Sequence, residues 1–298
     1  MKNEITKEPP LDAKIQEMED YLSIKVTDNK RGEWAKEMED LIIEKSPLPI
    51  FFDYSVQDFI DFKIFAYTHF FGGIKLATVS MEINTRIAEM ASKCKKKSDL
   101  LKNLSLKDKY KSDLVSEGIE LPKEICFLPG SNEWDKFSLE KVVEYMFYNP
   151  DIFIKYHPLT DSECKKEIEN HISSDRIITT DLSADQLIRN ATTVYGTTAS
   201  ELISKAVLLE KDIVSISNFF TKSGGTYYPI NRILFNEKDK EKRLDKLSRI
   251  VSCDYSGIIL PNTNNIEERI DNFFKKALEI RDQLKPISTP LLRKIYKD

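Results

Sequence analysis

The chain has 298 residues, of which 41% are hydrophobic and 32% are charged, and its formal net charge is −4. This length predicts a sizeable core in one large or two modest domains, and the acidic balance argues against a dedicated nucleic-acid binder, whose surface usually carries a strong positive excess. The four cysteines lie far apart, with no CxxC pair and no zinc spacing, which favours reduced thiols in a cytoplasmic protein.

The first part of the chain predicts a helix-rich unit. Apolar residues at helical spacing predict helix within residues 11–45, and two prolines then end that region. The run "IFFDYS" (50–55) predicts a short buried strand that stops at an acid, Asp53. The segment "GGIKLATVSM", which begins at Gly72, predicts a second strand after a glycine turn.

A lysine-rich stretch covers residues 92–111. Two interpretations stay open: a solvated segment that joins two domains, or a basic patch that faces acidic lipids or phosphates. The chain opens on a polar, charged segment without the apolar run of a signal peptide, and no run approaches the roughly 18 apolar residues that span a bilayer. We therefore expect a cytoplasmic protein, with peripheral contact to the inner face of the membrane if the basic patch serves that purpose.

The part of the chain that follows Pro122 alternates between strand and helix patterns. This alternation predicts βαβ units around a parallel sheet, hence the α/β class. A long amphipathic helix is predicted over residues 266–284. The predicted strands cover residues 124–130, 151–159, 176–180, 192–196 and 212–217, and the predicted helices 138–149, 161–172, 184–191 and 198–210.

Polar residues gather where the predicted strands end. In open parallel sheets, ligands bind beyond the carboxyl ends of the strands. Backbone N–H groups at the start of the 198–210 helix, with threonine hydroxyls and an imidazole, would suit a phosphate. Ordinary helix capping and a structural strand-end histidine are the alternatives. The residues at these strand ends are Pro129, Gly130 and Ser131; His157; Thr179, Thr180 and Asp181; Gly196, Thr197, Thr198 and Ser200; and Ser217 and Asn218.

Asp53 is the candidate general base of the N-terminal part. It ends an apolar strand, so partial burial would raise the pKa of its carboxyl group; an Asx-turn or a helix cap is the alternative. His69 precedes a glycine turn and is a weaker candidate, and His171 is expected on the surface. No Walker A or GxGxxG motif is present, which argues against ATP or NAD binding by those devices, and no metal-ligand spacing occurs.

The segment "FIKYHP" (153–158), followed about forty residues later by "VYGTTAS" (194–200), resembles motifs of GT-B-fold glycosyltransferases that use CMP-activated sugars. Bacterial sialyltransferases are the nearest family, with capsule-building Kdo transferases nearby. The resemblance implies a GT-B-like pair of Rossmann-like domains, the N-terminal one small and helix-rich, with a C-terminal helix that packs back. It divides the chain into an acceptor-side domain (1–120) and a nucleotide-sugar-binding domain (121–298).

The resemblance also implies roles for individual residues. His157 would contact the donor phosphate and protonate it as CMP leaves, while Asp53 would act as the base on the acceptor hydroxyl. The sequence departs from the family pattern at the acidic motif, which is reduced to this one Asp, and at the paired serines, which are threonines here. The implied donor-binding residues are Pro129, Gly130, Ser131, Lys155, His157, Gly196, Thr197, Thr198 and Ser200.

The function implied is an inverting, metal-independent transfer of a sialic acid-like sugar from a CMP donor to a hydroxyl of a surface glycan. The donor is a substrate, so no cofactor is expected. Two alternatives remain. One is a GT-B transferase that uses a UDP-sugar or CDP-glycerol donor on a polymer or on modified phage DNA. The other is a non-catalytic GT-B scaffold that binds partners.

Overall fold

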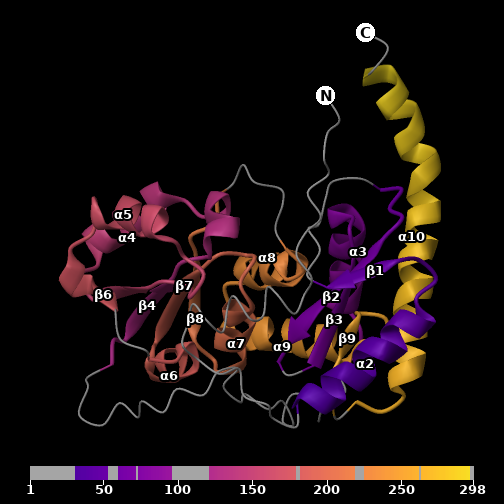
Figure 1. The fold of residues 1–298 in the computed structure, drawn as a ribbon, viewed down its shortest axis with the longest axis horizontal. Coiled ribbons are helices and arrows are strands. Elements are labelled where there is room, and N and C mark those ends of the chain that lie inside the picture. The colour runs from indigo at the N-terminus through magenta and orange to yellow at the C-terminus, as the bar shows by residue number, and fades with distance from the viewer. Residues whose placement is uncertain are drawn as a thin grey trace, which may run out of the picture.

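The computed structural model describes residues 31–52, 60–71, 73–95, 121–178, 182–218, 225–261 and 263–295. These residues form two β-sheets with helices packed against them, and a long helix runs along the outer side of the first sheet (Figure 1). The predicted α/β class is confirmed, as is the C-terminal helix that packs back onto the N-terminal part. Of the helix predicted within residues 11–45, the described part is α2 (Arg31–Lys45).

The first sheet is mixed and has the order β1-β2-β3-β9. β1 runs parallel to β2, whereas β2, β3 and β9 pair antiparallel. The helices α2, α3 and α10 pack around this sheet, and together they form what we call the first unit. Besides α2, the elements of the first unit are β1 (Ile50–Phe52), β2 (Phe65–Phe70), β3 (Gly73–Thr78), β9 (Ile258–Ile259), α3 (Met81–Ala91) and α10 (Ile266–Ile295).

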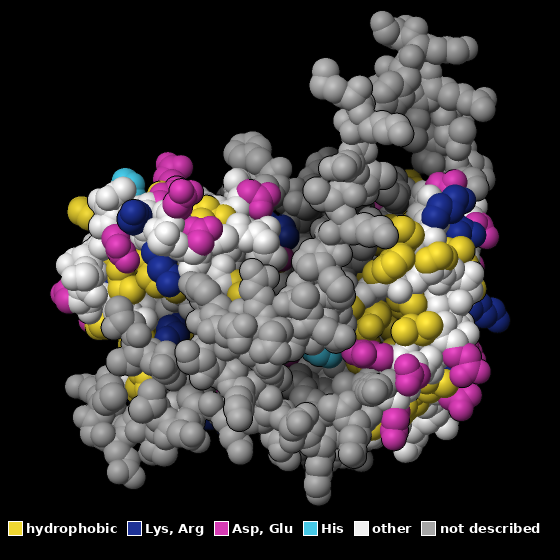
Figure 2. Space-filling model, viewed as in Figure 1, with side chains coloured by type: hydrophobic (Ala, Val, Ile, Leu, Met, Phe, Trp, Pro, Cys, Tyr) yellow, Lys and Arg dark blue, Asp and Glu magenta, His cyan; other side chains and the backbone are white. Residues whose placement is uncertain are grey.

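Aromatic side chains fill the core of the first unit. The rings of Phe65 and Phe274 lie 4.7 Å apart, and those of Phe62 and Phe65 lie 5.1 Å apart. Large aromatic side chains bury much apolar area each, so this cluster is a main source of the unit's stability. On the outside, Figure 2 shows hydrophobic side chains gathered over this unit beside a group of acidic ones.

The second sheet is fully parallel and has the order β6-β5-β4-β7-β8, as the alternating pattern predicted. Helices connect the strands, and α8 and α9 follow β8 in the chain; we call this the second unit. Its strands are β4 (Glu124–Phe127), β5 (Ile152–Lys155), β6 (Ile177–Ile178), β7 (Thr193–Gly196) and β8 (Asp212–Ser215). Its α-helices are α4 (Leu139–Tyr148), α5 (Ser162–Glu169), α6 (Ala184–Asn190), α7 (Glu201–Leu208), α8 (Tyr228–Asn236) and α9 (Lys240–Ser252).

Local hydrogen bonds fix where the helices of the second unit begin. Asp161 is the N-cap of α5, and its carboxylate accepts the Cys164 N–H at 2.8 Å. This bond, together with one from the Ser131 hydroxyl, lowers the pKa of Asp161 below its usual value. Such caps satisfy backbone donors that the helix itself leaves without partners.

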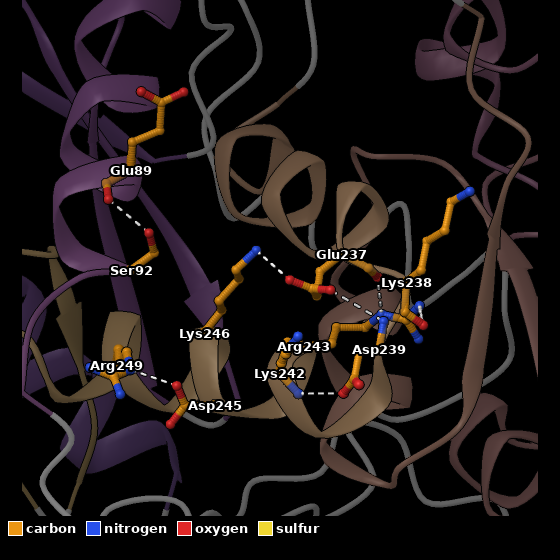
Figure 3. A network of polar contacts seen from close by, with 10 residues as sticks. All are labelled: Glu89, Ser92, Glu237, Lys238, Asp239, Lys242, Arg243, Asp245, Lys246 and Arg249. Atoms are coloured by element: carbon orange, nitrogen blue, oxygen red, sulfur yellow. Dashed lines mark hydrogen bonds and ion pairs between the residues drawn. The ribbon is translucent and has the colours of Figure 1, made fainter.

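Helices α8 and α9 join the two units: both contact α3 of the first unit and α7 of the second. Neither helix was predicted from the sequence. Figure 3 shows the polar network at the turn between them. The Arg243 guanidinium donates to the Glu237 carbonyl at 3.0 Å, and Lys246 pairs with the Glu237 carboxylate at 2.7 Å. At the other end of α9, Arg249 pairs with Asp245 at 2.6 Å. The network fixes the direction in which α9 leaves α8.

The chain returns to the first sheet after α9. Strand β9 pairs with β3, and Arg269 of α10 donates to the carbonyl groups of Val251 and Cys253 at 2.8 and 3.0 Å. The predicted boundary between residues 120 and 121 stays a prediction, because residues 96–120 lie outside the described part. Because β9 pairs with β3, the first sheet contains a strand from late in the chain.

Neither a membrane span nor a metal centre is seen in the described ranges. None of the helices there combines the length and apolar character needed to cross a bilayer. No group of three or more His, Cys, Asp or Glu side chains in those ranges is arranged to hold a metal ion.

Candidate functional site

The second sheet reverses its winding direction between β4 and β7. From β4 the chain adds β5 and β6 on one side, and then β7 and β8 on the other. In open parallel sheets, ligands bind beyond the carboxyl ends of the strands at such a reversal. Residues 129–131 follow β4 and residues 197–200 follow β7, so two of the predicted polar strand ends flank this point.

The loops that follow β4 and β5 are hydrogen-bonded to each other. The Ser131 N–H donates to the Leu159 carbonyl at 3.2 Å, and the Thr160 hydroxyl donates to the Pro129 carbonyl at 3.1 Å. The Asp161 N–H donates to the Ser131 hydroxyl oxygen at 2.8 Å. These bonds hold the two loops as one rigid element. We call residues 129–131 and 157–161 together the double turn.

His157 is an exposed member of the double turn. Its Nδ1 accepts the Leu159 N–H at 3.1 Å, so in the neutral imidazole the proton lies on Nε2. Gly130 lies against the ring: a Cβ atom on Gly130 would be only 3.1 Å from the His157 Nδ1. The glycine therefore leaves the space in which the imidazole sits.

The turn that leads from β7 into α7 is held by hydrogen bonds on both sides. The Ser200 hydroxyl caps α7 by accepting the Leu202 N–H at 3.3 Å. The Thr198 N–H donates to the Ser217 hydroxyl oxygen at 2.8 Å. On α8, the Asn231 amide donates to the carbonyl groups of Thr198 and Ser200 at 2.9 and 2.7 Å. The turn is thus preorganised at the N-terminus of α7, where the helix dipole favours an anion.

A lysine adds positive charge beside the end of β8. The Lys141 ammonium donates to the Ser217 carbonyl at 2.7 Å, and burial lowers the pKa of Lys141 below its usual value. The neighbouring Lys136 is paired with the Glu133 carboxylate at 2.9 Å. Lys141 therefore supplies a positioned cation near the turn that precedes α7.

The first unit reaches the same edge of the second sheet. The Phe71 N–H, just after β2, donates to the Glu201 carboxylate at the start of α7 at 2.8 Å. The Tyr227 hydroxyl donates to the His69 carbonyl. The His69 ring lies 5.1 Å from the Phe52 ring, at the carboxyl end of β1. The ends of β1 and β2 therefore lie near the start of α7.

Not every predicted site residue is open to a ligand here. Thr197 is only 2% exposed, Gly196 is buried, and the Ser131 hydroxyl is engaged within the double turn. Lys155 is half-buried at the end of β5. The predicted contacts of these residues with a donor stay predictions.

Two other predicted groups lie outside the described residues. These are the candidate base Asp53, which directly follows β1, and the strand end at 179–181. His171, expected on the surface, is exposed.

Sequence analysis missed Asn231, which is fully buried and holds the turn before α7. The Ser204 hydroxyl donates to its side-chain oxygen at 2.8 Å, so the amide is fixed in orientation. The signal available was an asparagine on the apolar face of an amphipathic segment, α8, to which no element had been assigned. Lys141 was likewise missed, because on its own it is an ordinary residue of an amphipathic helix.

Comparison with known proteins identifies no family for the chain. No protein-family model matches it, and none of the curated proteins matches it. Among solved structures, it is similar to a protein from Listeria monocytogenes assigned as a UDP-N-acetylglucosamine 2-epimerase, at 13% identity and a TM-score of 0.28. That similarity covers 76% of this chain, which spans about half (54%) of the length of that protein. A similarity at this level indicates neither a fold nor a function for this chain.

Proposed function

We propose that the protein binds a nucleotide sugar at the reversal point between β4 and β7 and transfers the sugar to an acceptor hydroxyl with inversion. One observation carries the proposal: the double turn with His157 and the turn before α7 flank the point where the winding of a parallel sheet reverses. A phosphate there would meet an imidazole N–H, helix N-terminal amides and a nearby ammonium group. These groups neutralise the charge of a leaving phosphate without a metal ion.

The proposed reaction is a single displacement. The base takes the proton of the acceptor hydroxyl, the oxygen attacks the anomeric carbon, and the bond to the nucleotide phosphate breaks on the opposite side. His157 Nε2–H donates to the departing phosphate, and Asp53 is the proposed base. The contacts of His69 and Phe71 with the second unit support a role for the first unit on the acceptor side. The division at residues 120 and 121 belongs to the same proposal.

The finer assignments rest on the resemblance of the sequence motifs. They are a CMP-linked, sialic acid-like donor, a surface-glycan acceptor and contact with the inner membrane face. A UDP-sugar or a CDP-glycerol donor would bind at the same sheet edge but contact other residues around it. A non-catalytic scaffold would bind a partner there without transferring a group. These possibilities give different results in one binding experiment.

Thermal stability measured with CMP, CDP, UDP and their sugar or glycerol conjugates tests the proposal, because a ligand that binds the native state raises the melting temperature. We expect CMP to raise it, and His157→Ala to abolish the shift. His171→Ala is the matched control: it removes an exposed histidine after α5 and should keep the shift. A shift with UDP alone would replace the donor assignment. No shift with any nucleotide, or a full shift in His157→Ala, would overturn the proposed site.

A further inference from the structure

Cys94 and Cys253 lie side by side where the two units meet. Their sulfur atoms are 2.8 Å apart, although 159 positions separate them in the chain, and both are free thiols. Cys94 lies just beyond α3 of the first unit, and Cys253 is the C-cap of α9 in the second. The Tyr255 hydroxyl lies 3.4 Å from the Cys94 sulfur. Two chain segments from different units thus place a thiol pair at their junction.

We propose that Cys94 and Cys253 form a modification site for a low-molecular-weight disulfide such as glutathione disulfide, which oxidises the pair to a disulfide that joins the two units. In the first step the Cys94 thiolate attacks one sulfur of the oxidant, forms a mixed disulfide and releases one thiolate. In the second step the Cys253 sulfur attacks Cys94, its proton passes to the departing thiolate, and a second thiol leaves. Two protein thiols are oxidised and one external disulfide is reduced to two thiols.

The surroundings of the two sulfurs assign the order of attack. Cys94 is half-buried, so an oxidant can reach it, whereas Cys253 is 3% exposed and burial raises the pKa of its thiol well above its usual value. Lys93 and Lys95 flank Cys94, and the Arg249 guanidinium, which Figure 3 shows on α9, donates to the Cys94 carbonyl at 3.0 Å. Arg249 is itself paired with Asp245, so the two lysines are the charges that attract an anionic oxidant such as glutathione disulfide.

The bond can form with little movement. A disulfide needs a sulfur–sulfur distance of about 2.05 Å, so the two sulfurs have to approach by roughly 0.8 Å. The bond would close a loop of some 160 residues, and loops of this length restrict the unfolded chain strongly. It would also tie the end of α3 to the end of α9, which fixes the first unit against the second. This inference does not depend on the proposed function.

The test uses the full-length protein in glutathione buffers of increasing oxidised fraction, with blocked thiols and peptide mapping by mass spectrometry without reductant. We expect an intramolecular Cys94–Cys253 peptide pair, a fall from four to two titratable thiols, and a melting temperature raised by roughly 10 °C. Addition of a dithiol reductant should reverse all three changes. Because this measurement is made on the natural sequence, it does not depend on any variant folding.

Variants sharpen the result. Cys94→Ser and Cys253→Ser should each lose the crosslink and the rise in melting temperature, and Cys94→Ser should also take up no glutathione at this site. Cys164→Ser is the matched control, because Cys164 is a half-buried thiol on α5 and should leave the crosslink intact. A stable glutathione adduct on Cys94 without the crosslink, an intermolecular dimer, or pairing through Cys126 or Cys164 would overturn the proposal.

Discussion

The two sheets differ in what their strands expose. In the first sheet, β3 is buried along its whole length, as are five of the six positions of β2. In the second sheet, β5 alternates between buried and half-buried residues, and its end opens into the double turn with the exposed His157. Apart from its edge strand β1, where Phe51 is 47% exposed, the first sheet is therefore built chiefly for packing, while the second combines packing with a polar edge. In this chain the proposed functional edge is marked by glycines and hydroxyls that follow parallel strands.

The glycines follow the same division. Gly257 lies against the first sheet with φ +77°, and a Cβ atom there would be 2.6 Å from the Leu76 carbonyl oxygen. Its function is backbone packing, since the Leu76 N–H donates to its carbonyl at 2.7 Å. Gly130, by contrast, makes space for a side chain of the site. Substitutions at these positions should therefore separate stability from ligand binding.

The largest effect is expected for Gly257→Ala. The added methyl group meets backbone, which cannot move aside, in a conformation that residues other than glycine seldom adopt. We expect a loss of about 3–4 kcal/mol in the free energy of unfolding, measured by urea denaturation. Gly225→Ala is the matched control, because among the described residues its Cβ would meet only the Glu133 side-chain oxygen, at 3.5 Å. Equal stability of the two variants would contradict the packing role of Gly257.

A smaller effect, specific to the first sheet, concerns Lys75. This lysine is 6% exposed, its ammonium donates to the Ser256 carbonyl at 2.9 Å, and burial lowers its pKa from 10.5 to about 7. Between those values the unfolded chain holds one more proton than the native protein, so stability rises with pH and falls as the pH drops towards 7.

We therefore expect the wild-type protein to lose about 2 kcal/mol relative to Lys75→Met between pH 9.5 and 7.5. Urea denaturation at several pH values measures this difference. Lys275→Met, at an exposed position of α10, is the control: its free energy of unfolding should change with pH as that of the wild type does. Parallel curves for wild type and Lys75→Met would show that the amine stays charged in the native protein.

The smallest change in stability is expected at the edge of the second sheet. Gly130→Ala places a Cβ atom 3.0 Å from the Asn132 side-chain oxygen and 3.1 Å from the His157 Nδ1, so both groups must shift by a few tenths of an ångström. We expect less than about 1 kcal/mol of lost stability, but roughly tenfold weaker binding of whichever nucleotide stabilises the wild type. Calorimetric titration measures the affinity. Unchanged affinity would show that the position of the imidazole does not matter for binding.

Local sequence patterns were sufficient to predict most elements of the second unit's sheet. Alternating strand and helix patterns predicted its parallel sheet and the helices between the strands, because these patterns depend on neighbours a few residues apart. The polar strand ends were predicted for the same reason. Helix α9 was within reach as well, since Arg243, Leu247, Ile250 and Val251 share one buried face, although it was not predicted.

The arrangement of the elements in space depends instead on contacts between distant segments of the chain. Strand β9 has two residues, too few for any periodicity, and it becomes a strand only by pairing with β3 far earlier in the chain. The reversal point between β4 and β7 depends on the order in which strands join the sheet, which no local pattern encodes. The burial of Lys75 and the meeting of Cys94 with Cys253 likewise arise from the packing of distant segments, because burial and contact are properties of the whole fold.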